Sequence, residues 1–170
     1  MHNQLIPDQS IPLNAHFTAS AVIIAQGQIL LIHHKRIGAW LPPGGHLDEG
    51  ELPHQACLRE VLEETGVECQ IVADAVPDTG DLEAFILPAP LVMHRVLAHE
   101  NGSPVIHMDI AYLCRPLLEL SGELPRPAAS DEVWGARWVE LSALPTLQLA
   151  KNVTEIVQLA VDRLACFSDL

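Results

Sequence analysis

The sequence predicts an α/β fold in which one mixed β-sheet is flanked by helices. Short runs rich in Val, Ile and Leu alternate with turn signals, and two longer segments repeat apolar residues with the period of a helix. The 170 residues, 49% of them hydrophobic, suffice for one domain with a core, and no repeat or linker divides them. We therefore expect a single domain over residues 17–170, preceded by an extended N-terminal leader over residues 1–16.

The first half of the chain predicts a hairpin, a short strand and a helix. Residues 17–25 are an apolar, β-branched run, and the turn signal Gln26-Gly27 leads into a second apolar run over residues 28–33. Residues 37–45 read as a short strand that runs into a Pro/Gly loop. A helix is expected over residues 53–65, because proline suits its first turn and Gly66 suits the residue after its end.

The second half predicts four strands and a closing helix. The strands are expected over residues 68–73, 91–98, 105–115 and 133–139, and Asn101-Gly102 marks a hairpin turn between the middle two. Two exposed loops, residues 74–90 and 119–130, contain several prolines. The helix over residues 151–166 has an apolar face that suits packing in the core or in a homodimer.

The charge of the chain excludes several classes of function. There are 22 acidic against 9 basic residues, a formal net charge of -13. General binding to nucleic acid or to an anionic membrane needs a positive surface, and an anionic ligand would here need a metal ion to mediate the contact. The N-terminus lacks the features of a signal peptide, no run approaches the length of a membrane span, and the four cysteines have no CxxC spacing. We expect a soluble, cytoplasmic protein.

Three like charges crowd one patch of the first predicted helix. On a helical wheel Glu60, Glu63 and Glu64 share an arc about 100° wide, and each close pair typically costs about 0.2–0.5 kcal/mol. We expect these carboxylates to point outward, away from a buried face on the opposite arc that holds Leu58, Val61, Leu62 and Thr65. Oxygen ligands suit Mg²⁺ or Mn²⁺ rather than zinc, and Gly44-Gly45 would let backbone carbonyls approach the same ion. The alternative is a solvated acidic helix face without a ligand.

The residues around this helix resemble the Nudix box, GX5EX7REUXEEXGU. Gly45 is followed after five residues by Glu51, and after seven more by REVLEETGV, residues 59–67, without a gap. WLPPGGH over residues 40–46 is similar to the approach to the box in this family. The resemblance implies a Nudix α/β/α sandwich that hydrolyses nucleoside diphosphates linked to another moiety.

The resemblance also implies roles for individual residues. Arg59 would orient Glu51 and the glutamates of the helix, and Gly66 would end that helix. Glu132, six residues before a tryptophan, is similar to a downstream glutamate that some members use as a further ligand or general base. The implied metal ligands are Glu60, Glu63, Glu64 and the carbonyl of Gly44. The implied catalytic residues are Glu63, Glu64, Arg59 and Glu132.

Candidate substrate contacts lie near the box. Gly45 and His46 belong to the loop of the box and could touch phosphate, and Lys35 and Arg36 could complement its charge or lie on the surface. Phe85 is a candidate for stacking on a base, together with Trp134 and Tyr112. The other histidines show no HxxxH or HExxH spacing, and we interpret them as surface or hydrogen-bonded side chains.

Two functions are compatible with these patterns. The first is a pyrophosphohydrolase that uses Mg²⁺ or Mn²⁺ to cleave a diphosphate linkage in a small nucleoside triphosphate or nucleoside-diphosphate derivative, with a small-molecule substrate rather than nucleic acid or membrane as partner. The second is a catalytically silent Nudix module that binds or senses a nucleotide. Silent modules usually lose carboxylates of the box, and this chain keeps all of them.

Overall fold

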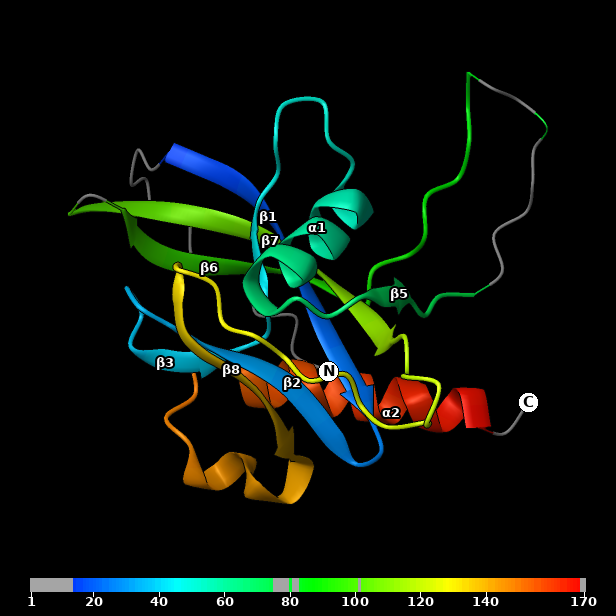
Figure 1. The fold of residues 1–170 in the computed structure, drawn as a ribbon. Coiled ribbons are helices and arrows are strands. Elements are labelled where there is room, and N and C mark those ends of the chain that lie inside the picture. The colour runs from blue at the N-terminus through cyan, green and yellow to red at the C-terminus, as the bar shows by residue number, and fades with distance from the viewer. Residues whose placement is uncertain (1–13, 75–79, 81–82, 101, 169–170) are drawn as a thin grey trace, which may run out of the picture.

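The computed structural model describes residues 14–74, 80, 83–100 and 102–168 (Figure 1). The expected leader, residues 1–16, therefore lies mostly outside the described residues, as does much of the loop expected over residues 74–90. The elements in chain order are β1 (Asn14–Ala25), β2 (Gln28–His34), β3 (Ala39–Leu41), β4 (Gly44–His46), α1 (Pro53–Thr65), β5 (Cys69–Ile71), β6 (Val92–Glu100), β7 (Ser103–Pro116), β8 (Val133–Glu140), the 3₁₀ helix η1 (Leu141–Thr146) and α2 (Val153–Ser168).

The sheet is mixed and is organised around the long strand β1. β1 runs parallel to β7 over ten residue pairs, from Asn14 opposite Val105 to Ile23 opposite Cys114. β4, β5 and β6 add antiparallel partners on this side, while the far end of β1 pairs with β2, which in turn pairs with β3 and β8. The predicted α/β class with a mixed sheet is confirmed.

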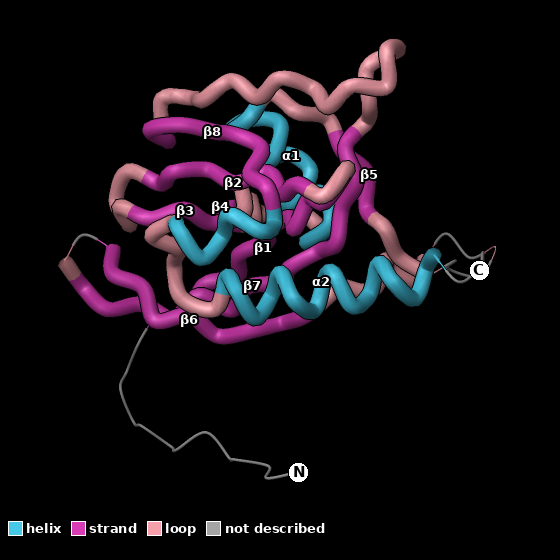
Figure 2. Tube along the Cα trace, turned by 90° about the horizontal axis from the view of Figure 1, so that it is seen from below, coloured by secondary structure: helices cyan, strands magenta, loops and turns pink. Residues whose placement is uncertain are grey.

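The two helices cover opposite faces of the sheet (Figures 1 and 2). Side chains of β1 alternate between the two faces, as strand geometry requires. Ala19, Ala21 and Ile23 pack with α1, whereas Val22 and Ile24 pack with α2. The α/β/α layering implied by the resemblance is therefore present, with one hydrophobic core on each side.

Local sequence signals account for several element ends. Gln26 and Gly27 both have positive φ, 52° and 76°, which allows the tight turn between β1 and β2. α1 spans the predicted residues 53–65 and ends at Gly66 in the left-handed conformation, φ 67°. Leu52 offers no side-chain cap, and the Gln55 side chain instead accepts a hydrogen bond from the Leu52 N–H at 3.1 Å.

The structure differs from the expected elements at several places, and most other bounds shift by one to three residues. β1 begins at Asn14, three residues before the expected strand, because its start is paired with β7. The Gly-Gly segment expected as loop forms β4 against β1, and the 3₁₀ helix η1 had no sequence signal that we interpreted. Among the described residues, no helix is long and apolar enough to cross a membrane.

Candidate functional site

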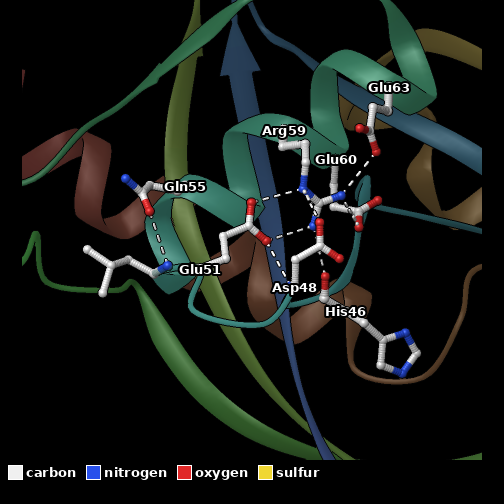
Figure 3. Close-up of polar contacts among 8 residues, drawn as sticks. His46, Asp48, Glu51, Gln55, Arg59, Glu60 and Glu63 are labelled. Carbon is white, nitrogen blue, oxygen red and sulfur yellow. Dashed lines mark hydrogen bonds and ion pairs between the residues drawn. The ribbon is translucent and has the colours of Figure 1, made fainter.

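Arg59 lies at the centre of the carboxylate cluster (Figure 3). Its guanidinium donates two hydrogen bonds of 2.9 Å to the two carboxylate oxygens of Glu51. It also donates to Glu60 at 2.8 Å, to Glu63 at 3.0 Å and to the backbone carbonyl of His46 at 2.9 Å. A planar guanidinium can satisfy such a set at once, and its bond to Glu51 holds the pKa of that carboxyl below its ordinary value. The expected orienting contacts of Arg59 are present.

Two glycines allow β4 to pass close to the helix and the sheet. A Cβ on Gly45 would lie 2.4 Å from a carboxylate oxygen of Glu60. A Cβ on Gly44 would lie 2.5 Å from the backbone oxygen of Ala19 on β1. Any larger residue at either position would have to displace backbone or carboxylate, so the box glycines bring the backbone of β4 against the acidic cluster.

Glu64 is buried, contrary to the expectation that all three glutamates point outward. Glu64 is 3% exposed, and one of its carboxylate oxygens accepts a hydrogen bond of 2.9 Å from the N–H of Gly44. Burial raises the pKa of Glu64 to about 8 against the lowering effect of that bond, and the charges of Glu60, Glu132 and Glu63 add to the rise. Burial also raises the pKa of Glu60, although Arg59 opposes the shift.

Leu62 was expected in the core. This expectation is wrong, because Leu62 is 49% exposed. The wheel gives the relative angles of side chains but not the arc that faces the sheet. Ala56 and Cys57 share the side of the helix that carries the glutamates, and their small side chains let that side approach the sheet. The Cys57 thiol lies 3.4 Å from the backbone oxygen of Ser20 on β1. The buried arc is therefore rotated toward Glu64 and away from Leu62.

Glu132 lies near the cluster although it is 68 residues beyond Glu64 in sequence (132 minus 64). It is exposed, and its charge contributes to the raised pKa of both Glu60 and Glu64. The preceding residue, Asp131, accepts a hydrogen bond from the Lys35 ammonium through its backbone oxygen. The structure thus brings Glu132 to the glutamates of α1 and uses Lys35 to hold the segment beside it.

The donor set fits a hard divalent cation. Glu60, Glu63 and Glu64 present carboxylate oxygens, and among the described residues Arg59 is the cation within hydrogen-bonding distance of Glu60 and Glu63. For Glu64, the contacts of the described residues include the neutral N–H of Gly44 and no cationic side chain. Oxygen-rich sets of this kind are those in which proteins hold Mg²⁺ or Mn²⁺.

A cavity of about 540 Å³ opens beside the box on the face of the sheet that carries α2. Its lining includes Gly44, Gly45 and His46 of β4, together with Arg36 from the turn after β2. This volume is in the usual range for small-molecule sites. β4 therefore borders both features, because Gly45 lies against Glu60 and also lines the cavity.

Asp109, which the sequence analysis does not name among the site residues, forms a buried polar anchor in the cavity wall. Its carboxylate accepts hydrogen bonds from Thr18 at 2.8 Å and Ser20 at 2.6 Å, and lies 3.0 Å from Nε2 of His94. Burial raises the pKa of Asp109, but these three bonds outweigh it and hold the pKa below its ordinary value. In the sequence, the feature that could have indicated this polar wall is the pair of hydroxyl residues Thr18 and Ser20, which lie on one face of an otherwise apolar strand.

Several predicted substrate contacts do not lie in this cavity. Lys35 is occupied by the Asp131 carbonyl, and Phe85 is 62% exposed and does not line the cavity. Tyr112 is buried in the core beside α1, so it cannot stack on a ligand. Trp134 stacks on His33, with 5.1 Å between ring centroids, and is also outside the lining.

Comparisons with known proteins agree with this architecture. The NUDIX domain family matches residues 15–160. A putative 8-oxo-dGTP diphosphatase of Bacillus subtilis is 40% identical over 60 residues, which are 34% of this chain and 40% of that protein. The human 8-oxo-dGDP phosphatase NUDT18 is 28% identical over 154 residues, which are 86% of this chain and 39% of that protein. The chain thus spans less than half the length of either curated relative.

A solved structure extends the likeness to the whole fold. The crystal structure of a NUDIX-family hydrolase from Clostridium perfringens superposes with a TM-score of 0.68 and 26% identity, covering 89% of this chain and 99% of that one. Nudix pyrophosphohydrolases are hydrolases that act on phosphorus-containing anhydrides, and Nudix enzymes generally use divalent metals. With the family matched over residues 15–160, the chain belongs to the NUDIX domain family.

Proposed function

We propose that the chain hydrolyses a diphosphate linkage in a small nucleoside triphosphate or nucleoside-diphosphate derivative, by attack of water on phosphorus. The observation that carries this proposal is that β4 borders both the acidic cluster and the cavity, since Gly45 lies against Glu60 and lines the cavity. A diphosphate beside β4 would meet the carboxylates of α1 through a cation, while the rest of the substrate would occupy the cavity.

Glu60, Glu63 and Glu64, with the backbone carbonyl of Gly44, would hold Mg²⁺ or Mn²⁺. Such an ion, when bound, supplies positive charge to phosphate oxygens and lowers the pKa of a coordinated water. Arg59 keeps Glu60 and Glu63 in place through its hydrogen bonds. Arg36, at the cavity wall, would complement phosphate charge, and His46 would flank it.

Proton acceptance is assigned to Glu64 or Glu132. Glu64 is buried beside Gly44, and its raised pKa reflects a carboxyl that holds a proton readily near neutral pH. Glu132 is exposed and within electrostatic reach of the same cluster. Replacing each by Gln and comparing the pH profiles of kcat would separate the two roles.

The substrate would be recognised in part by the polar wall around Asp109. The carboxylate of Asp109 and the ring of His94 are partly buried and line the cavity. Both could hydrogen-bond to the edge of a nucleobase, which fits the oxidised-purine substrates named for the two curated relatives. The cytoplasmic location and the homodimer expected from the sequence stay predictions.

A screen of nucleotides tests the proposal. 8-oxo-dGTP, 8-oxo-dGDP, the unmodified nucleotides and ADP-ribose would be incubated with the protein and Mg²⁺ or Mn²⁺, with phosphate and nucleotide products quantified. We expect turnover of at least one of them, loss of turnover in chelator and recovery with the metal. In ¹⁸O-labelled water the label should enter a phosphate-bearing product.

Three results would contradict the proposal. Full activity in excess chelator would exclude the metal, and label in the sugar or base would indicate glycosidic chemistry. Tight nucleotide binding without turnover of any substrate would favour the sensor function expected as the alternative.

A further inference from the structure

A second cluster of metal-ligating side chains lies apart from the carboxylates of α1. It consists of His46 on β4, Glu100 on β6 and His107 on β7. Glu100 and His107 lie on the antiparallel pair β6 and β7, whereas His46 comes from a distant part of the sequence. The ligating atoms of the three side chains all lie within 4.8 Å of one another. The pairing of β4 with β1 and of β1 with β7 brings these strands together, so the cluster is a product of the fold.

One carboxylate oxygen forms the centre of this cluster. Oε1 of Glu100 lies 3.1 Å from Nε2 of His46 and 2.9 Å from Nε2 of His107. In a tetrahedral zinc site with bonds near 2.0–2.1 Å, neighbouring ligand atoms are about 3.3 Å apart. The two distances to Glu100 are therefore within a few tenths of an ångström of that spacing, and the ligating atoms of the two histidines lie within 4.8 Å of each other. Small rotations would open room for an ion between the three side chains.

The surroundings suit a site with an accessible fourth position. The Glu100 and His107 side chains are both 21% exposed, so they are held by the fold but reachable from solvent. All three residues line the cavity described above. The ring of His16 on β1 packs edge-on against His46 at 5.5 Å between centroids and adds a third imidazole beside the cluster.

We propose that His46, Glu100 and His107 form a binding site for a divalent transition metal of the Zn²⁺, Co²⁺ or Ni²⁺ class. Two imidazole nitrogens and one carboxylate oxygen are a donor set that favours these ions over Mg²⁺, which prefers oxygen ligands only. The fourth position faces the cavity, where water or an atom of a bound ligand would complete the shell. The site needs none of the carboxylates of α1, although it shares His46 with the proposed phosphate contact.

Metal titration of the purified protein tests this site. Zn²⁺ binding would be measured by calorimetry in excess Mg²⁺, which occupies the oxygen-rich carboxylate cluster. The visible absorption of bound Co²⁺ would report the coordination geometry. We expect one equivalent of Zn²⁺ to bind to the wild-type protein and Co²⁺ to give the intense spectrum of a low-coordinate site. His107→Ala and Glu100→Gln should each weaken Zn²⁺ binding by about 100-fold or more.

His99→Ala is the matched control, because it removes an imidazole from the residue next to Glu100, outside the cluster. It should bind Zn²⁺ like the wild type, and thermal melts of all variants would verify that each is folded. Should His107→Ala fold poorly, Glu100→Gln keeps the shape of the side chain and gives an independent answer.

Several results would overturn the inference. These are no stoichiometric Zn²⁺ binding by the wild-type protein, unchanged affinity in folded His107→Ala or Glu100→Gln, and equal weakening in His99→Ala. A sulfur-to-cobalt charge-transfer band would assign the ion to the cysteines and would overturn it as well.

Discussion

Replacing Glu64 by Gln should stabilise the metal-free protein even though it removes a proposed metal ligand. Glu64 is 3% exposed, and burial raises the pKa of its carboxyl from 4.5 to about 8. Between these two values the folded protein retains a proton that the unfolded chain has released. The free energy of unfolding of the metal-free protein must then fall as pH rises through this window. Gln can still accept the hydrogen bond of the Gly44 N–H, but it has no charge to desolvate.

The size of the stability change follows from the shift in the pKa of Glu64. A change from 4.5 to about 8 corresponds to at most about 5 kcal/mol at pH values above 8. Because about 1 kcal/mol moves Tm by roughly 2–4 °C in a domain of this size, Glu64→Gln should raise the Tm of the chelator-treated protein by at least about 5 °C at pH 8. At pH 5 both proteins hold a neutral side chain at this position in the folded state, and the difference should nearly vanish.

Thermal melts in chelator from pH 5 to pH 8 provide the measurement. Glu63→Gln is the matched control, because the Glu63 side chain is 59% exposed and its replacement keeps the buried carboxyl of Glu64, so the pH dependence of Tm should change far less than in Glu64→Gln. Mg²⁺ should narrow the gap between wild type and Glu64→Gln, since the ion favours the charged carboxylate. If wild type and Glu64→Gln lose stability in parallel as pH rises, the burial of an ionisable Glu64 is not the cause and the reasoning fails.

Three further changes test other parts of the site. Glu63→Gln should lower turnover by about 10²–10⁴-fold with little change in Tm, as measured by product release and thermal melts; near-wild-type rates would misplace the metal site. Gly45→Ala should weaken the apparent Mg²⁺ affinity in activity titrations, because its methyl group would lie 2.4 Å from a carboxylate oxygen of Glu60. Gly135→Ala is the control, because a Cβ there would have its nearest neighbouring atom at 3.9 Å. If both substitutions change the Mg²⁺ affinity equally, the clash with Glu60 is not the cause. Leu62→Glu should leave Tm nearly unchanged because Leu62 is exposed, and unfolding would show that Leu62 is needed in the core.

Signals that act within a few residues predicted the fold best. Pro53 and Gly66 bound α1 at both ends, and Gln26-Gly27 places the first hairpin, because backbone preferences decide these features without tertiary context. Helix geometry also accounts for the contact of Arg59 with Glu63, since a helix places residues four apart side by side. The contact with Glu51, which precedes α1, was implied by the resemblance to the Nudix box.

Features that depend on pairing between distant strands could not be read in the same way. The burial of Glu64 follows from how closely α1 approaches β1 and β4, which depends on small residues in three separate elements. The cluster of His46, Glu100 and His107 requires the register between β1 and β7, and a one-residue slip in that register would turn His107 to the other face. The alternation of side chains along β7 likewise directs Tyr112 into the core and Asp109, on the opposite face, into the cavity wall.

The like charges on α1 are compensated unequally, and this inequality bears on function. Arg59 donates to Glu60 and Glu63, so part of their repulsion is relieved within the chain itself. Glu64 is the most buried of the three and receives a neutral backbone N–H, while Glu60, Glu132 and Glu63 all raise its pKa. A carboxyl in this position lowers the stability of the metal-free fold at neutral pH, and a smaller or apolar residue would avoid that loss. Its cost to the fold is offset if a cation binds to Glu64 together with Glu60 and Glu63, which makes Glu64 the residue at which stability and the proposed chemistry oppose each other most directly.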